Sequence, residues 1–161
     1  LWFTDNGRDL LGDDTPSCEL NRAPKAGLHF GFPYIHASSV IDPEFGAPVF
    51  PVEPPVVELG PHVAPLAMKF YTGTMFPERY RGEIFIAEHG SWNRTPEAGH
   101  TGYNITMVNP ETGATTILID GWLKNNVAWG RPTDILEMPD GSLLIADDHA
   151  NVIYRLTYET P

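Results

Sequence analysis

The chain has 161 residues, enough for one domain with a hydrophobic core, and 42% of them are hydrophobic. Its 21 acidic residues outnumber 10 basic ones, and the formal net charge of −11 repels nucleic acid and anionic membranes. An acidic surface that aids solubility is the simpler interpretation of this charge, and a protein that holds cations is the other. With 15 glycines and 16 prolines the chain turns often, so we expect neither long helices nor a membrane span.

The first part of the chain reads as a strand followed by an acidic loop. Residues 1–4 form the predicted strand, and residues 5–16 form a loop that contains Asp5, Asp9, Asp13 and Asp14. Carboxylates near glycine turns can bind Ca²⁺, but this spacing does not match an EF-hand. A solvated acidic loop is therefore the preferred interpretation of these side chains.

The next part alternates short apolar stretches with proline. Residues 18–21 predict a short strand, and residues 38–61 predict an extended surface loop, long enough to suggest a function. His29 and His36 lie outside any metal-ligand spacing, so we expect them to be structural.

The most informative stretch is a strand that runs directly into a polar loop. Residues 84–87 are apolar, and Glu88, His89, Trp92, Asn93 and Arg94 follow within a few positions. The same arrangement opens the chain at residues 1–8 and returns at residues 143–149, where Asp147, Asp148 and His149 read as a turn. Strands that repeatedly deliver polar loops are typical of a radially repeated β architecture.

Further strands complete this pattern. Residues 63–71 predict a strand, residues 72–81 a turn region that can include a helical turn, and residues 103–119 a hairpin with its turn at 109–113. Residues 121–130 read as a loop. Three strands then follow at residues 135–138, 143–146 and 152–156.

The predicted fold class is all-β, with residues 1–161 forming a partial β-propeller of two to three blades. A propeller closes with roughly four to eight blades, so the ring would be completed by a missing segment, such as an N-terminal one, or by another chain in a homo-oligomer.

Several short motifs resemble the glucose/sorbosone dehydrogenase family, most closely its L-sorbosone dehydrogenase branch. They occur in the family's order at residues 1–9 (LWFTDNGRD), 19–21 (ELN), 28–33 (LHFGFP), 42–46 (DPEFG), 62–65 (HVAP), 80–94, 129–134 (WGRPTD) and 139–144 (PDGSLL). The resemblance implies the C-terminal part of a six-bladed propeller that binds pyrroloquinoline quinone (PQQ) and Ca²⁺. It also implies oxidation of sugars, sugar aldehydes or polyols in the periplasm or outside the cell, with a cytochrome or a quinone as electron acceptor.

The resemblance assigns the metal to a backbone site. By motif position, the carbonyl oxygens of Gly7 and Arg8 would bind Ca²⁺, and such oxygens suit a hard cation. Arg8 replaces the proline of the glucose dehydrogenase branch, but only its carbonyl group would be used.

The resemblance also assigns residues to PQQ, a planar quinone with three carboxylates. Arg131 matches an arginine that meets a PQQ carboxylate, whereas Thr133 replaces a second arginine. The other implied contacts lie in the loop after residue 87, with Trp129 as an alternative to Trp92 for stacking: His89, Trp92, Asn93 and Arg94.

The family's general base has no counterpart among the residues of this chain. The catalytic residues therefore stay unassigned, and we expect the isolated chain to be a poor dehydrogenase. Two other functions stay open. A Ca²⁺-dependent propeller lactonase could use the carboxylates of residues 5–14, and a non-catalytic extracellular propeller module would need no base.

Overall fold

A computed structural model describes residues 1–159 of the chain. Two compact units are present. The first contains Leu1–Pro65 and Ser91–Gly102, and the second contains Leu66–Gly90 and Tyr103–Pro161.

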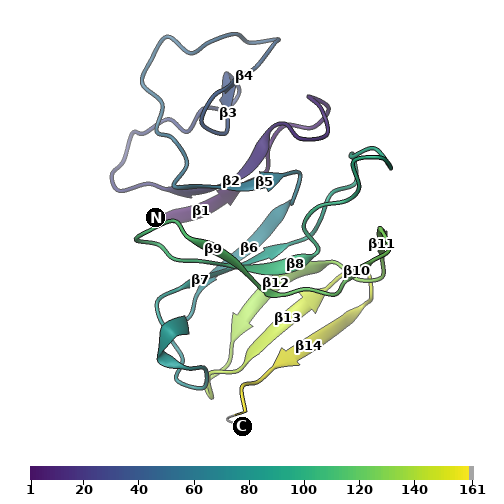
Figure 1. The fold of residues 1–161 in the computed structure, drawn as a ribbon. Helices are drawn as coiled ribbons and strands as arrows, with labels where there is room; N and C mark the ends of the chain where they lie inside the picture. The colour runs from purple at the N-terminus through teal and green to yellow at the C-terminus, as the bar shows by residue number, and fades with distance from the viewer. Residues whose placement is uncertain (160–161) are drawn as a thin grey trace. The chain divides into compact units, whose positions relative to one another are not determined.

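The first unit is built on a three-stranded antiparallel sheet (Figure 1). Its strand order is β1 (Trp2–Asp5), β2 (Ser17–Arg22) and β5 (Val57–Pro61). Buried Leu20 of β2 faces buried Val57 of β5, and this apolar contact selects the pairing.

The prediction of a loop over residues 38–61 was therefore wrong at both ends. Val57–Pro61 is strand β5, and β4 (Val40–Ile41) pairs with β3 (Ile35–His36). Strand β5 forms because it pairs with β2, which is distant in sequence, and β4 forms because the chain reverses after β3. The many prolines of this segment predicted a loop, but they carry no information about such pairing.

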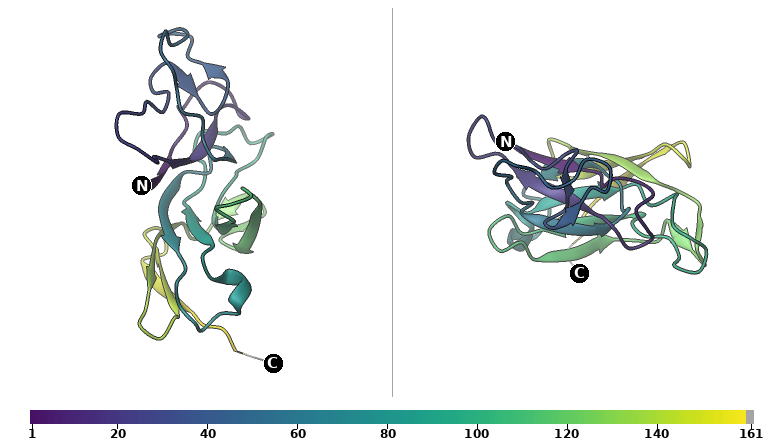
Figure 2. Two further views of the ribbon diagram at one scale, coloured as in Figure 1. Left: turned by 90° about the vertical axis from the view of Figure 1, so that its left-hand side faces the viewer. Right: turned by 90° about the horizontal axis from the view of Figure 1, so that it is seen from above.

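The second unit contains a four-stranded sheet in the order β6 (Pro65–Phe70), β7 (Ile84–Glu88), β8 (Asn104–Val108) and β9 (Thr115–Ile119). All five residues of β7 are buried, as expected for a central strand. The hairpin between β8 and β9 is confirmed. In the β6–β7 connection, the 3₁₀ helix η1 (Glu78–Tyr80) confirms the predicted helical turn (Figure 2).

A second sheet of this unit holds β12 (Pro132–Glu137), β13 (Leu143–Asp147) and β14 (Val152–Leu156) in sequence order. The loop predicted at residues 121–130 is instead a hairpin of β10 (Leu123–Lys124) and β11 (Val127–Ala128). Asn125 and Asn126 have φ angles of 51° and 61°, which two-residue hairpin turns favour.

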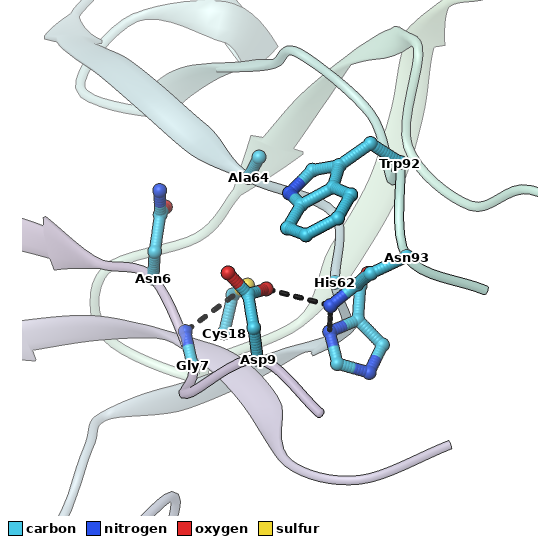
Figure 3. A pocket seen from close by; sticks show the side chains of 8 residues that line it. All are labelled: Asn6, Gly7, Asp9, Cys18, His62, Ala64, Trp92 and Asn93. Carbon is cyan, nitrogen blue, oxygen red and sulfur yellow. Dashed lines mark hydrogen bonds between the residues drawn. The ribbon is translucent and has the colours of Figure 1, made fainter. Parts of the chain in front are cut away.

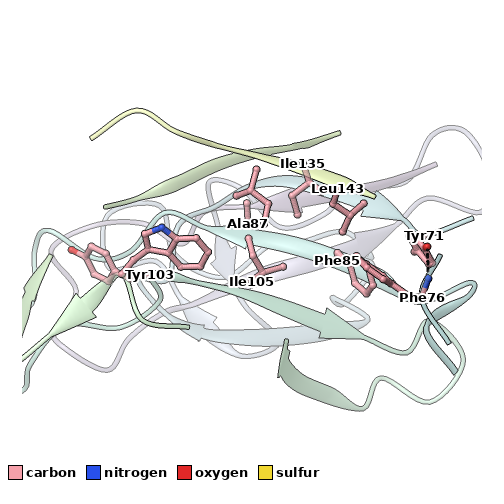
Figure 4. Close-up of a cluster of buried hydrophobic side chains, with 10 residues drawn as sticks. Tyr71, Phe76, Phe85, Ala87, Tyr103, Ile105, Ile135 and Leu143 are labelled. Carbon is pink, nitrogen blue, oxygen red and sulfur yellow. Dashed lines mark hydrogen bonds between the residues drawn. The ribbon is translucent and has the colours of Figure 1, made fainter. Parts of the chain in front are cut away.

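The two sheets of the second unit share one hydrophobic core (Figure 4). Ile135 of β12 and Leu143 of β13 lie over Phe85 and Ala87 of β7. Tyr71, which is fully buried, donates its hydroxyl proton to the carbonyl oxygen of Gly141 over 2.9 Å.

The all-β fold class is confirmed, and three sheets of three or four strands match the predicted two to three blades. Across residues 1–159, no helix is both long and apolar enough to cross a membrane.

Glu88, the last residue of β7, is 3% exposed and belongs to a hydrogen-bonded cluster. Thr106 Oγ1 lies 2.7 Å from Glu88 Oε1 and 2.9 Å from Asn104 Oδ1. The Thr106 hydroxyl has one proton and can donate to only one of these two oxygens. If Glu88 is protonated, its own proton can make the second hydrogen bond of the cluster. Burial accordingly raises the pKa of Glu88 to about 7, against the opposing hydrogen bonds from Thr106 and Asn104.

The turn after β7 requires glycine at position 90. Gly90 has a φ angle of 96°, and a Cβ atom there would lie 2.3 Å from the ring of Tyr103. Gly82 has a similar φ of 84° but open space around it.

We expect Gly90→Ala to destabilise the protein by about 3 kcal/mol or more, because overpacking adds to backbone strain. Gly82→Ala should cost only about 1 kcal/mol, since it carries the strain without the clash. Urea unfolding of both variants measures the difference. Equal losses would contradict the close packing of Gly90 against Tyr103.

A second prediction concerns pH. Because the folded pKa of Glu88 lies above its ordinary value of 4.5, its contribution to stability is complete below pH 4.5 and is lost as the pH rises through about 7. The loss should be on the order of 3 kcal/mol. In Glu88→Gln this component should vanish, so the free energies of unfolding of variant and wild type should diverge between pH 4.5 and 8. Parallel curves over that interval would show that Glu88 is not protonated in the fold.

Candidate functional site

The residues assigned by sequence fall into both units. Gly7 and Arg8 belong to the first unit, together with the 92–94 segment. His89 and Arg131 belong to the second.

In the first unit, three of the assigned residues line one hollow, which we call the Trp92 pocket (Figure 3). It is a small hollow with a volume of about 80 Å³. Its lining contains one carboxylate, two amides and an indole, and neither lysine nor arginine: Asn6, Gly7, Asp9, Cys18, His62, Ala64, Trp92 and Asn93.

Gly7 forms the tightest part of this pocket. A Cβ atom at this position would lie 2.9 Å from the Pro16 ring and 3.0 Å from the carbonyl oxygen of Ser17, so a larger residue would force the loop to move. The Gly7 N–H donates to Cys18 Sγ over 3.4 Å. Among residues 1–159, no hydrogen bond is found to the carbonyl oxygens of Gly7 and Arg8, which leaves both able to accept another partner.

Asn93 connects the two sides of the Trp92 pocket. Its Nδ2 donates to Asp9 Oδ1 over 2.6 Å and to His62 Nδ1 over 3.3 Å. His62 Nε2 lies 2.7 Å from the carbonyl oxygen of Gly12 and donates to it, which leaves Nδ1 facing the Asn93 amide. Asn93 Oδ1 is buried without a hydrogen-bond partner among the described residues. Such an acceptor commonly marks the place of a water molecule or a ligand group.

The side chain of Arg8 points to a different part of the first unit. Its guanidinium forms ion pairs with Asp42 and with Glu44. Asp42 is 1% exposed and also lies 2.9 Å from His36 Nε2. The hydrogen bond from Arg8 holds the pKa of Asp42 well below its usual range despite burial. The structural role predicted for His36 agrees with this contact.

Arg94 is occupied by protein acceptors. Its guanidinium donates to Asp14 over 2.9 Å, to the Ala98 carbonyl over 3.1 Å and to the carbonyls of Asp13 and Gly99. Its side chain is only 6% exposed. Thr95 adds two hydrogen bonds to Asp13, which lower the pKa of that carboxyl. Arg94 therefore fastens the acidic loop to the 91–102 segment.

In the second unit, Arg131 secures the loop that follows β7. Its Nε donates to the carbonyl oxygen of His89 over 3.0 Å, and its Nη2 donates to that of Gly90. The guanidinium carbon lies 5.3 Å from the centre of the Tyr103 ring. The guanidinium also has a side-chain hydrogen bond with Tyr103, and these contacts together hold it in a fixed orientation.

The polar residues at 147–149, which follow the third strand of the repeated strand-then-loop arrangement, form a turn. Asp147 Oδ1 accepts the backbone N–H groups of Arg131, His149 and Ala150 at 2.8 to 3.0 Å. Burial opposes ionisation, but these hydrogen bonds outweigh it, and the pKa of Asp147 is lowered. Asp148 lies 2.9 Å from His89 Nε2, a contact that spacing alone did not suggest.

The two candidate tryptophans differ in their surroundings. Trp92 is 65% exposed beside the pocket. Trp129 donates its indole N–H to the Gly121 carbonyl over 2.6 Å, and its ring meets that of Tyr154 edge-on. Trp129 is still 51% exposed, but its indole N–H and one side of its ring are engaged within the second unit.

Sequence reasoning missed Asn6, Asp9 and His62 as members of one pocket. The two Asx residues flank Gly7 in the printed motif, which was a usable signal. His62 lies far from them in sequence, and its place in the 62–65 motif was the available signal; in the structure it has a φ angle of 57°.

Comparisons with known proteins agree with this fold. The TrAA12-like family model matches residues 46–157. An uncharacterised protein of Borreliella burgdorferi is 41% identical over 168 aligned positions, which cover 99% of this chain and 44% of that protein. The chain thus spans less than half of this curated relative.

Solved structures at about 20% identity support the fold alone. The PQQ domain of pyranose dehydrogenase from Coprinopsis cinerea has a TM-score of 0.59, with 97% of this chain and 49% of that chain covered at 20% identity. The calcium structure of a Trichoderma reesei AA12 enzyme has a TM-score of 0.68, with 96% and 47% covered at 20% identity. The apo aldose sugar dehydrogenase of Escherichia coli has a TM-score of 0.62, with 98% and 41% covered at 20% identity.

These neighbours confirm the expected propeller-type fold. The family model covers more than half of the chain. The chain belongs to the TrAA12-like family.

Proposed function

We propose that the chain is part of an oxidoreductase that uses PQQ and Ca²⁺ to oxidise a sugar, sugar aldehyde or polyol. Membership of the TrAA12-like family supports the general class. The names of the structural neighbours, a PQQ domain of a pyranose dehydrogenase and a calcium structure of an AA12 enzyme, support the cofactor and the metal.

The loop at Gly7 suits a hard cation. The carbonyl oxygens of Gly7 and Arg8 accept no hydrogen bond from the described residues, so a metal ion would not displace one. Ca²⁺ prefers such oxygens, and the side chain of Arg8 is directed to Asp42. The ion pair with Asp42 would fix the backbone at this point without placing the guanidinium beside the metal.

Arg131 suits a carboxylate of the quinone. Its orientation is fixed by two backbone carbonyls before any ligand arrives, and its remaining N–H groups can donate. This pre-oriented cation is the observation on which the PQQ assignment rests. His89, in the same loop and beside Asp148, would act as a further polar contact.

Arg94 and the Trp92 pocket suit the quinone less well. Arg94 already satisfies four protein acceptors, and its role is to position the loop. The pocket contributes the carboxylate of Asp9 and no basic side chain, so without a bound metal ion it disfavours an anionic group.

The bound quinone would supply the chemistry by accepting two electrons from the substrate, with Ca²⁺ as a Lewis acid at a quinone oxygen. The residues of this chain would bind the quinone and the metal ion and hold them in a fixed orientation. A periplasmic or secreted location and an external electron acceptor belong to the same proposal.

The lactonase alternative depends on side-chain carboxylates that converge on a metal. Among residues 1–159, no group of three or more His, Cys, Asp and Glu side chains lies close enough to hold one. Asp9, Asp13 and Asp14 each bond a different partner. The acidic loop is thus better explained by its attachment to the 91–102 segment.

The test is a PQQ titration of the intact protein with excess Ca²⁺, followed by calorimetry. We expect Arg131→Ala to weaken binding by roughly 10- to 100-fold, because a charge-assisted pair is lost. Arg131→Lys should recover only part of the affinity, since lysine cannot form two parallel hydrogen bonds. Arg81→Ala is the matched control, because Arg81 is exposed and pairs only loosely with Glu78 at 3.9 Å.

If a folded Arg131→Ala protein binds PQQ as tightly as the wild type does, Arg131 does not contact the quinone. No PQQ binding by the wild-type protein, with or without Ca²⁺, would leave the non-catalytic propeller module as the better explanation.

A further inference from the structure

We propose that Glu88 is a positioning residue for Arg131, and that a proton on Glu88 keeps the loop after β7 in the conformation that orients the guanidinium. The loop is closed while Glu88 carries this proton and opens when Glu88 ionises. This inference rests on the proposed function in so far as that function assigns Arg131 to the quinone, but the opening of the loop can be measured without any cofactor.

The first argument is the place of Glu88 in the sheet. It is the last residue of β7, and the next two residues carry the carbonyl oxygens that accept hydrogen bonds from Arg131. The carbonyl oxygen of Glu88 itself accepts the N–H of Tyr103 over 2.9 Å. The Tyr103 ring lies close to Gly90 and 5.3 Å from the guanidinium carbon of Arg131. A displacement of the end of β7 therefore reaches Arg131 both along the loop and through Tyr103.

The second argument is the set of hydrogen bonds around the carboxyl group. Two side chains of the paired strand β8, Asn104 and Thr106, bond it. A protonated Glu88 can donate to Thr106 Oγ1 over 2.7 Å, and the Thr106 hydroxyl can then donate to Asn104 Oδ1 over 2.9 Å. Ionisation removes the first donor of this series and leaves a charge at a position that is 3% exposed.

The third argument is that no counter-ion stabilises this charge. Burial is the main cause that raises the pKa of Glu88 to about 7, and the hydrogen bonds from Thr106 and Asn104 are the only opposing causes. No charged side chain among residues 1–159 contributes to the shift. The titratable side chains of the loop and of the segments that contact it each bond a partner other than Glu88: His89, Tyr103, Arg131, Asp147 and Asp148. A buried carboxylate without a counter-ion is stabilised by moving toward water.

The fourth argument is that the loop is the part that can move. The four residues of β7 before Glu88 are all 0% exposed, and Phe85 and Ala87 belong to the hydrophobic core. His89 begins the loop, and its side chain is 18% exposed. Opening at the end of the strand therefore costs less than displacing its core residues. Such an opening would shift the carbonyl oxygens of His89 and Gly90 and with them the hydrogen bonds that orient Arg131.

The first measurement is amide hydrogen exchange of the intact protein without PQQ, between about pH 6 and pH 9, with correction for the intrinsic exchange rate. The Tyr103 amide reports the end of β7, because it donates to the Glu88 carbonyl. The Tyr71 amide donates to the Glu83 carbonyl over 2.9 Å and reports the start of the same strand. Since each pH unit above a pKa weakens the protonated form by about tenfold, we expect the protection of Tyr103 to fall at least about tenfold further than that of Tyr71.

Variants identify the group that titrates. Glu88→Gln keeps a donor at this position and cannot ionise, so its Tyr103 amide should stay protected over the whole pH range. Glu83→Gln makes the same change just before β7 and is the matched control, which should keep the pH dependence of the wild type. Parallel loss of protection at Tyr103 and Tyr71 in the wild type would show that Glu88 acts on the whole unit, and it would overturn the inference. A Glu88→Gln protein with the wild-type pH dependence would overturn it as well.

The second measurement is the PQQ affinity of the same proteins over the same pH range, at constant excess Ca²⁺. We expect the affinity of the wild type to fall at least about tenfold as the pH rises, and that of Glu88→Gln to change by less than about twofold. Any titration of PQQ itself affects both proteins equally.

The two proposals can fail separately. If the loop opens but the PQQ affinity of the wild type does not change with pH, Glu88 does not position Arg131, and the proposed function stands without this inference. If the wild type binds no PQQ at any pH, the proposed function is wrong. In that case a selective loss of protection at Tyr103 would still support control of the loop by Glu88, and its absence would overturn that control.

Discussion

The hydrogen bonds from Arg131 to the carbonyl oxygens of His89 and Gly90 are the interaction on which the account of the second unit depends. They join the loop after β7 to the start of β12, and they orient a cation within the same unit. Gly90 makes them possible, because its positive φ angle and missing side chain let the loop pass close to Tyr103. The guanidinium of Arg131 thus both holds the loop in place and is proposed to bind the ligand.

The first unit uses its charges differently. Arg8 and Arg94 both pair with acidic side chains or carbonyl groups of the protein, so neither adds positive charge to the Trp92 pocket. The pocket is consequently an acceptor-rich site with an exposed aromatic face. A carboxylate of the quinone needs a cationic donor, and this is the reason for assigning that contact to Arg131.

Much of the fold could be predicted because its signals are local. The strand at Ile84–Glu88, the hairpin from β8 to β9 and the strand Val152–Leu156 follow from apolar runs and turn residues. The strand β5 and the hairpin β10–β11 could not, because pairing with distant residues or positive φ angles at two asparagines decide them. The sequence could predict which loops contribute residues to the candidate site. Whether an arginine there faces a ligand or the protein depends on contacts such as that between Arg94 and Asp14, some eighty residues apart in sequence.

The most direct measurement is a crystal structure of the intact protein grown with PQQ and Ca²⁺. The account predicts an ion at roughly 2.3–2.6 Å from the carbonyl oxygens of Gly7 and Arg8, the distance usual for Ca²⁺. It also predicts a quinone carboxylate within hydrogen-bond distance of Arg131. An ordered quinone whose carboxylates avoid Arg131, or an ion held by the side chains of the acidic loop instead, would contradict it.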